Sequence, residues 1–202
     1  MNEPQAYKND PFKGQSNLRS KFYIQPGHPK VIRTAVDSSD TIADVFQKIF
    51  SENDESMYMF WSDIPIRFHY TFEFCMNLER LSTLLDKICK NPEGQEQFVL
   101  LTDALVGNWS VNWGNNEIAI DASWKGRPPF EGYASALNGT ETLKCSKDDF
   151  MAEWKLPFIQ VMNALDDVKA IGMNKDIDEI IQKMGSVLQA TDHYGVQYDK
   201  KR

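Results

Sequence analysis

The chain has 202 residues, of which 42% are hydrophobic and 12% aromatic, and it carries a formal net charge of −7. This length and apolar fraction predict one packed domain and exclude global disorder. No apolar run approaches the roughly 18 residues that a membrane-spanning helix needs, so we expect no membrane partner.

Residues 1–20 are polar and broken by proline and glycine, and they contain no apolar stretch of the kind that a secretory signal needs. We expect them to form a flexible arm, followed by a single domain at 21–192 and a frayed tail at 193–202. Short strands are predicted at 21–25 and 31–36, on either side of a Pro-Gly-His-Pro turn.

A helix is predicted after these strands. Polar residues at 37–40 offer N-cap candidates, and apolar residues recur at helical spacing over 42–50. The clearest strand is predicted at 66–74, where IRFHYTFEF alternates between apolar and polar residues. A second helix is predicted at 78–88, and the apolar run 98–105 fits a buried strand or a short helix equally well.

The stretch 109–124 reads WSVNWGNNEIAIDASW and contains three tryptophans. A two-residue turn at its central Asn-Asn would pair Trp113 with Ile118 and Trp109 with Ala122, because asparagine tolerates the positive φ that such turns require. This register places all three indoles on one apolar face. The other face then carries small polar residues: Ser110, Asn112, Asp121 and Ser123. We therefore predict a core hairpin and not an aromatic ligand platform, with the small polar face left for solvent or a partner.

An Asn-Gly pair predicts a further hairpin, with strands at 133–137 and 140–145. Ser146 followed by Asp149 is typical of a helix N-terminus. The helix that begins there contains Pro157, so we expect it to kink or to restart.

A last helix is predicted at 176–189. Strands therefore cluster in the middle of the chain, with helices before and after them. This order predicts an α+β fold, with a central antiparallel sheet, helices packed on one face of it, and two C-terminal helices.

Charge is uneven along the chain. Residues 1–36 carry six basic and two acidic side chains, a net of +4, so the remainder carries −11 to give −7. An acidic body repels phosphate backbones, which argues against a nucleic-acid partner, and it attracts a basic protein. The three cysteines are an odd number at wide spacing, which favours a reducing compartment, the cytoplasm, over a disulfide framework.

Motifs for catalysis or cofactor binding are lacking in the sequence. The histidines have no second ligand at metal spacing, and no CxxC, HExxH, GxSxG, GxGxxG or P-loop pattern occurs. His69, with Arg67 and Glu73 close by on the predicted polar strand face, is the one histidine with titratable neighbours. Paired carboxylates such as Asp148-Asp149 fit helix caps or exposed faces. We expect no catalytic residue, no metal and no cofactor.

The best candidate for a partner-facing surface is the acidic and aromatic segment between residues 52 and 63. Aromatic residues are enriched at the centres of protein interfaces, and acids around them suit a basic partner. The residues that we predict to contact a partner are Glu52, Asp54, Glu55, Tyr58, Trp61 and Asp63. A buried strand after a solvated loop is the alternative interpretation of this segment.

The stretch 109–165 also carries a family resemblance. A hairpin (NEIAIDASW) is followed by a loop, a strand pair (YASALNGTETL) and a helix that opens with FMAEWK. This order, with Trp124, Phe150, Glu153 and Trp154 in it, resembles bacterial polymorphic-toxin immunity proteins. The resemblance implies a non-catalytic cytosolic domain that neutralises a cognate toxin by occluding its active or binding face. The implied partner is a basic toxin domain, and we expect a monomer or a homodimer.

Two other classes of function stay open at this point. One is a hydrolase whose Asp, Glu and His residues are dispersed in the sequence and meet only in the fold. The other is a sugar- or lipid-binding module that uses the aromatic residues of 57–74. A deep pocket with converging carboxylates would favour the hydrolase.

Overall fold

The computed structural model describes residues 21–32, 34–51, 56–168 and 175–189, so the predicted arm and tail lie outside the described residues. In chain order the elements are β1 (Phe22–Gln25), α1 (Ile42–Ile49), β2 (Met57–Trp61), β3 (Ile64–Phe68), the π-helix η1 (Tyr70–Phe74), α2 (Cys75–Lys90), β4 (Gly94–Leu101), β5 (Leu105–Gly114), β6 (Glu117–Gly126), α3 (Glu131–Asn138), β7 (Leu143–Ser146), α4 (Lys147–Asp167) and α5 (Lys175–Leu188).

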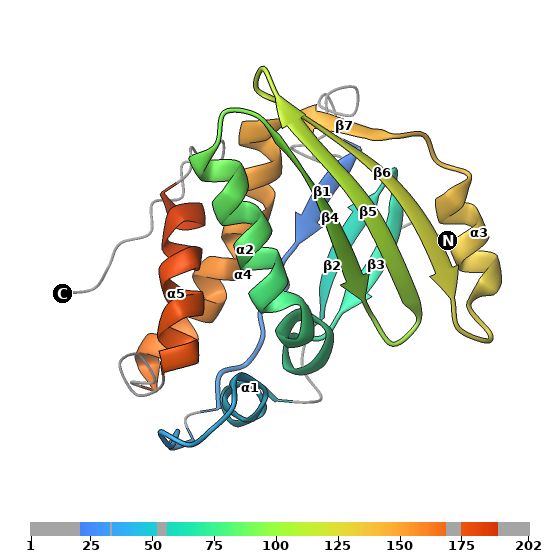
Figure 1. The fold of residues 1–202 in the computed structure, drawn as a ribbon. Helices are drawn as coiled ribbons and strands as arrows, with labels where there is room; N and C mark the ends of the chain where they lie inside the picture. The colour runs from blue at the N-terminus through green and yellow to red at the C-terminus, as the bar shows by residue number, and fades with distance from the viewer. Residues whose placement is uncertain (1–20, 33, 52–55, 169–174, 190–202) are drawn as a thin grey trace, which may run out of the picture.

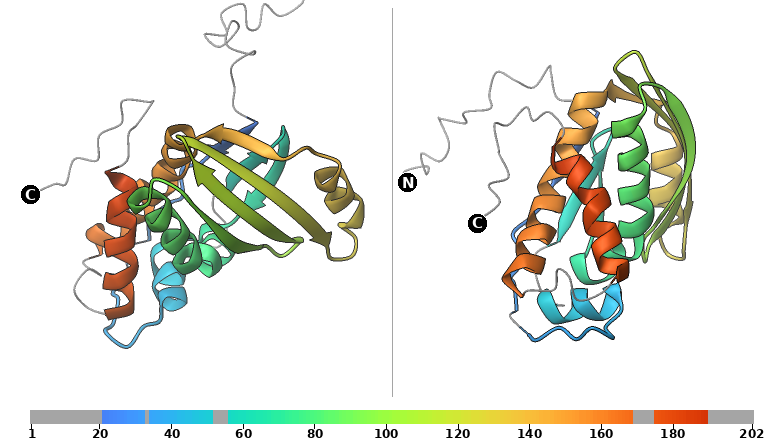
Figure 2. Two further views of the ribbon diagram at one scale, coloured as in Figure 1. Left: turned by 45° about the horizontal axis from the view of Figure 1, so that its top comes forward. Right: turned by 60° about the vertical axis from the view of Figure 1, so that its left-hand side comes forward.

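The α+β class and the two C-terminal helices are confirmed, and the strands are divided between two antiparallel sheets, β1-β2-β3 and β4-β5-β6-β7. The four-stranded sheet stands at one side of the molecule, with α2 against its inner face and α4 and α5 further inward (Figures 1 and 2). No described element covers its outer face. The described part of the molecule is therefore layered, with one broad sheet surface that none of its elements covers.

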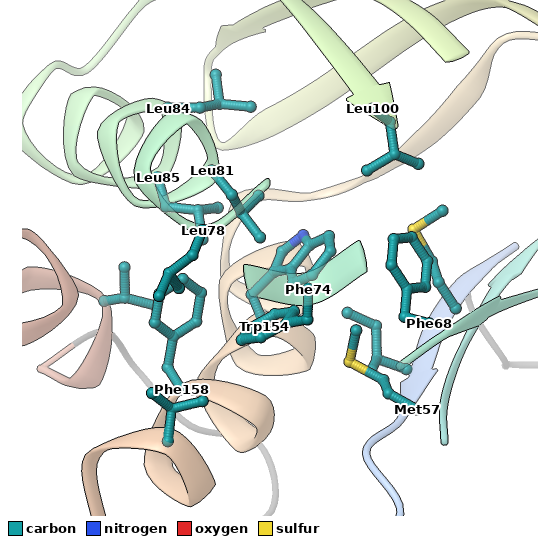
Figure 3. Close-up of a cluster of buried hydrophobic side chains, with 14 of the residues drawn as sticks. Met57, Phe68, Phe74, Leu78, Leu81, Leu84, Leu85, Leu100, Trp154 and Phe158 are labelled. Atoms are coloured by element: carbon teal, nitrogen blue, oxygen red, sulfur yellow. The ribbon is translucent and has the colours of Figure 1, made fainter. Parts of the chain in front are cut away.

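The core lies where the inner faces of both sheets meet η1, α2 and α4 (Figure 3). α2 contributes a leucine stripe, and α4 contributes Trp154 and Phe158, whose side chains are fully buried. Phe74 from η1 packs edge-on against Phe158, with ring centroids 5.9 Å apart. Apolar burial of this extent is the main force that holds the layers together.

The hairpin of β5 and β6 has the predicted register. Trp113 pairs with Ile118 and Trp109 with Ala122, and Asn115 and Asn116 form the turn with φ angles of 50° and 62°. The indoles of β5 and β6 point inward and are at most 6% exposed. The prediction of a core hairpin is thus confirmed.

Substituting Asn116 with glycine is expected to raise the free energy of unfolding by about 0.5–1 kcal/mol, because glycine adopts positive φ without the steric cost of a Cβ. Asn116→Ala is the matched control and is expected to lower it by about 1 kcal/mol. Urea unfolding followed by tryptophan fluorescence measures both. Equal stability of the two variants would contradict the role assigned to this turn.

The predicted strand at 66–74 is wrong beyond Phe68. The chain leaves β3 there and enters the π-helix, whose wide turn is closed by the Phe74 N–H donating to the His69 carbonyl at 3.0 Å. Tyr70 and Phe74 lie one helical turn apart and are both buried, so their aromatic spacing fits a helix as well as a strand. Alternation alone did not distinguish the two.

The hairpin predicted around the Asn-Gly pair is also wrong. Residues Glu131–Asn138 form α3, and Gly139 is its C-cap. The segment YASALN is rich in good helix formers, and glycine is common just after a helix as well as in a hairpin turn. Only Leu143–Ser146 becomes a strand, pairing with β6.

Smaller differences concern the ends of elements. The strand predicted at 31–36 is reduced to a single bridge between Val31 and Phe50. The N-cap of α1 is Thr41, one residue after the predicted candidates, and it forms a capping box with Asp44. The ambiguous run at 98–105 is the end of β4, a turn and the start of β5.

α4 and α5 agree well with their predicted patterns. The Ser146 side chain caps α4 by accepting from the Asp149 N–H at 3.0 Å. α4 continues through Pro157 as one helix, so it does not restart there. None of the helices in the described ranges is both long enough and apolar enough to cross a membrane.

Candidate functional site

The six residues predicted to contact a partner differ in their position and burial. Glu52, Asp54 and Glu55 lie outside the described residues. The prediction for Trp61 is wrong, because its side chain is 1% exposed and points into the core. Its indole lies 5.2 Å from that of Trp109 and donates to the Thr140 hydroxyl at 3.1 Å. Trp61 therefore stabilises the contact between the two sheets and cannot touch a partner.

Tyr58 and Asp63 remain accessible but do not form one cluster. Tyr58 is half-buried near the start of β2, on the outer face of the three-stranded sheet, where it pairs with Arg67. Asp63 is exposed in the β2–β3 turn, where it and Ser62 adopt positive φ. They sit at opposite ends of the hairpin, so the described part of the predicted patch is not a single surface.

Most aromatic residues of 57–74 belong to the core. The side chains that keep partial or full exposure are Tyr58, Phe60 and Phe72. Phe60 stacks on Tyr23 at a centroid distance of 4.2 Å and an interplanar angle of 7°. A ring already stacked in this way offers only one face to a sugar, so little of the predicted aromatic platform is available.

The outer face of the four-stranded sheet, here called the open face, is a polar surface on regular structure. The ladder register places on it the alternate side chains of all four strands. They are Gln95, Gln97, Val99, Leu101, Val106, Asn108, Ser110, Asn112, Glu117, Ala119, Asp121, Ser123, Lys125, Lys144 and Ser146. Every one of them is exposed or half-buried.

The composition of the open face is unfavourable for a sheet. Valine, isoleucine, threonine and aromatic residues stabilise exposed strand positions, whereas asparagine, aspartate and alanine are depleted there, on a scale spanning about 1 kcal/mol per residue. The two central strands β5 and β6 nevertheless place Asn108, Asn112, Ala119 and Asp121 on this face. Positions that break a local rule without a packing gain are where function is expected.

Hydrogen-bonding groups cross the open face in a row. The Gln97 side-chain amide donates to the Ser110 hydroxyl at 3.1 Å, and the Asp121 carboxylate on the next strand accepts from Thr142. The acids on the open face are Glu117 and Asp121, and two lysines on β6 and β7 balance them. The face is therefore close to neutral and rich in amides and hydroxyls that can pair with a polar surface.

The three thiols are held in their protonated form. Burial raises the pKa of Cys75 to about 12, and burial together with nearby carboxylates raises that of Cys145 to about 12. Burial also raises the pKa of Cys89, whose Sγ donates to the Ser186 carbonyl at 3.6 Å. A nucleophilic cysteine needs a lowered pKa, so none of these thiols is activated.

Alkylation by iodoacetamide at about pH 8 is expected to be at least tenfold slower for the folded protein than for the chain unfolded in guanidinium, because only the thiolate reacts. Mass spectrometry of each cysteine measures the rates. A cysteine that reacts as fast in the folded protein as in the unfolded one would contradict the protonated state described above.

Acidic and histidine side chains do not gather into a catalytic group within the described residues. Of the three predicted neighbours, Arg67 is exposed on β3, whereas Glu73 is buried and accepts the His69 backbone N–H at 2.8 Å. Hydrogen bonds from Ser39 and Thr41 lower the pKa of Asp37 and Asp44, respectively, which is opposite to what a general acid needs. No cluster that could hold a metal ion is present among the described side chains.

Sequence reasoning found the open face only in part. It identified the polar side chains of β5 and β6 but missed Gln95 and Gln97, because the segment at 98–105 could not be assigned to a strand. The alternation of Gln95, Gln97 and Val99 with inward-facing residues was the signal that could have found them.

Comparisons of the chain with protein-family models, with curated proteins and with solved structures gave no match.

Proposed function

We propose that this protein is a non-catalytic binding domain that neutralises a cognate toxin by docking onto it through the open face. The observation that supports this proposal is the composition of that face, where asparagine, alanine and aspartate occupy strand positions that they destabilise. Amide and hydroxyl groups held on a rigid sheet pair with a polar protein surface at little cost in side-chain entropy.

The shape of the open face favours a protein over a small molecule. Ligand sites are concave, whereas this surface is a sheet face. Four strands spaced about 4.8 Å apart and about 8 residues long cover roughly 500 Å². A standard interface takes about 800 Å² from each partner, so the face supplies more than half of one and the rest must come from its margins.

Charge favours a basic partner. The chain carries −7 overall, which attracts a basic domain over distances of about a Debye length and speeds its association. The open face itself is nearly neutral, so the net charge steers the encounter and the amides fix the orientation. Occlusion of the toxin's active or binding face then requires no chemistry from this chain.

A cytoplasmic location is part of this proposal. The cysteines are free thiols, as expected for a protein in a reducing compartment. A toxin that acts inside cells would meet its inhibitor there.

The test is co-expression with the C-terminal domain encoded by the gene directly upstream of the one for this chain. If that domain is the cognate toxin, we expect it to stop growth when expressed alone, this chain to restore growth, and the two to co-purify as a complex. Failure of both growth rescue and complex formation would contradict the proposed function.

A further inference from the structure

The edges of the three-stranded sheet are protected by specific side chains. In an antiparallel ladder, every second residue of an edge strand turns its backbone N–H and C=O outward. On β3 these positions are Pro65, which has no N–H, and the charged Arg67. On β1 the outward N–H of Ile24 donates to the buried Glu153 carboxylate at 2.6 Å. Both edges are therefore closed to a further strand.

The four-stranded sheet uses side-chain amides for the same purpose. On β6, beyond the end of β7, Asn138 accepts from the Trp124 N–H at 2.7 Å and donates to the Trp124 carbonyl at 2.8 Å. On β4, Asn77 forms the same pair of bonds with Leu101, at 3.0 and 2.6 Å. Each asparagine makes the two hydrogen bonds that a neighbouring strand would make. The outer edge of β7 is only four residues long and carries Lys144.

One stretch of edge is left without such protection. The Thr102 N–H donates to the Leu105 carbonyl, so the backbone of Thr102 faces β5. Because every second residue of an antiparallel strand faces the same neighbour, the backbone groups of Gln95, Gln97 and Val99 face away from β5. The bonds of Asn77 to Leu101 confirm this alternation. Among the described residues, no hydrogen bond outside the ladder reaches the backbone of these three. The stretch contains no proline, lysine or bulge, and its one charged side chain, Glu96, points inward and pairs with Lys87 of α2.

A groove runs beside this stretch. It has a volume of about 240 Å³ and lies between α2 and β4, with Arg80, Thr83, Leu84, Phe98 and Val99 among its lining residues. The Lys87–Glu96 ion pair, which joins the helix to the strand, also lines it. An extended chain paired with β4 would place every second side chain towards this groove and the alternate ones towards the open face.

We propose that the edge of β4 at 95–99 binds an extended strand of the protein partner, which adds a fifth strand to the sheet. This inference rests on the proposed function, because the strand would belong to the protein that covers the open face. Main-chain hydrogen bonds at 95, 97 and 99 would supply affinity, and the groove would select the side chains. The added strand would also supply part of the contact area that the open face lacks.

A strand from a basic partner fits this edge better than a second copy of the chain. Two copies would each carry −7, so their approach is opposed by charge. A two-fold axis at this edge would also bring α2 of each copy, with Arg80 and Lys87, against α2 of the other. A basic segment is attracted by the net charge and brings no second α2 to the edge.

The test uses the intact protein, labelled with nitrogen-15, and a synthetic eight-residue peptide of alternating threonine and valine with a lysine at each end. We expect saturable shifts in the backbone amide signals of Gln95, Gln97 and Val99. The same peptide N-methylated at every second residue lacks donors on one edge and serves as the control peptide. It is expected to bind at least tenfold more weakly.

Two proline variants give a matched comparison at the two edges. Val99→Pro removes an outward N–H without breaking the ladder and is expected to weaken peptide binding at least tenfold. Lys144→Pro makes the same change on the edge of β7 and is expected to leave peptide binding unchanged. Circular dichroism verifies that both variants are folded, and Gln97→Pro replaces Val99→Pro if that variant is unfolded.

The proposal is overturned if neither peptide shifts these amides at millimolar concentration, or if Val99→Pro binds as tightly as the parent protein. It is also overturned if sedimentation shows that the protein alone dimerises and that Val99→Pro makes it monomeric, because the occupant is then a second copy. If the peptide binds at the edge but growth is not rescued in the co-expression experiment, the proposal of a toxin partner is contradicted. The proposal that the edge of β4 binds a strand is then supported.

Discussion

Replacing Trp109 with alanine is expected to lower the free energy of unfolding by about 3–5 kcal/mol, the range for removing a buried tryptophan. Its side chain is 0% exposed. Ring centroids of Trp61, Phe98 and Trp124 lie 5.2, 5.3 and 6.1 Å away, from three other strands in both sheets. The loss therefore combines apolar transfer, a cavity and broken contact between the sheets.

Ser110→Ala is the matched control for this substitution. Ser110 is the next residue on the same strand, but it faces outward. Its variant is expected to stay within about 0.5 kcal/mol of the parent protein, as for most surface positions. Guanidinium unfolding of both variants measures the difference. A loss below about 1 kcal/mol for Trp109→Ala would contradict the assignment of the indoles to the core.

Replacing Ser110 with arginine is expected to weaken binding of the toxin domain by about 100-fold. The side chain lies in the middle of the open face, between Gln97 and Asp121 on the neighbouring strands. An arginine there would hold a basic surface away and leave a charge buried without a partner, at a cost of about 2–5 kcal/mol. That cost corresponds to a factor of about 30 or more in affinity.

Ser135→Arg makes the same change of charge on the exposed surface of α3. It is expected to leave both the affinity and the growth rescue unchanged, whereas Ser110→Arg should lose the rescue. Isothermal titration calorimetry with each purified variant gives the affinities. An equal loss in the two variants would mean that only net charge matters and that the open face is not the binding surface.

The elements with a strong local signal were predictable from the sequence. The hairpin of β5 and β6 followed from parity and from an Asn-Asn turn, because one buried face and one wet face fix the register. α4 followed from the cap at Ser146 and from its helical apolar period. In these places the local pattern and the tertiary contacts agree.

The mispredicted elements have sequence patterns that fit two kinds of secondary structure. Tyr70 and Phe74 alternate as in a strand and also lie a helical turn apart, and burial against α1, α2 and α4 decided for the helix. Asn138-Gly139 suits a hairpin turn and also a helix end, and the contact of α3 with β6 decided that case. The division of strands between two sheets depends on long-range pairing that no local pattern encodes.

The sequence did not predict which aromatic residues of the candidate contact surface are buried. Aromatic residues next to acids predicted a contact surface at 52–63, but the same aromatic character drives Trp61 into the core. The unprotected edge of β4 was not predictable, because it is defined by what other segments leave uncovered. Asn77 and Asn138, which are distant in sequence from the edge positions that they cover, bond to the backbone of Leu101 and Trp124.

The most direct test of the open face is a nuclear magnetic resonance titration of the labelled protein with the toxin domain, following side-chain amide signals. Those of Gln97, Asn108 and Asn112 lie on the open face, whereas that of Asn138 is bonded to the backbone of Trp124. We predict that the first three shift on binding and that the signal of Asn138 does not. Binding that leaves the three open-face signals unchanged would contradict the account.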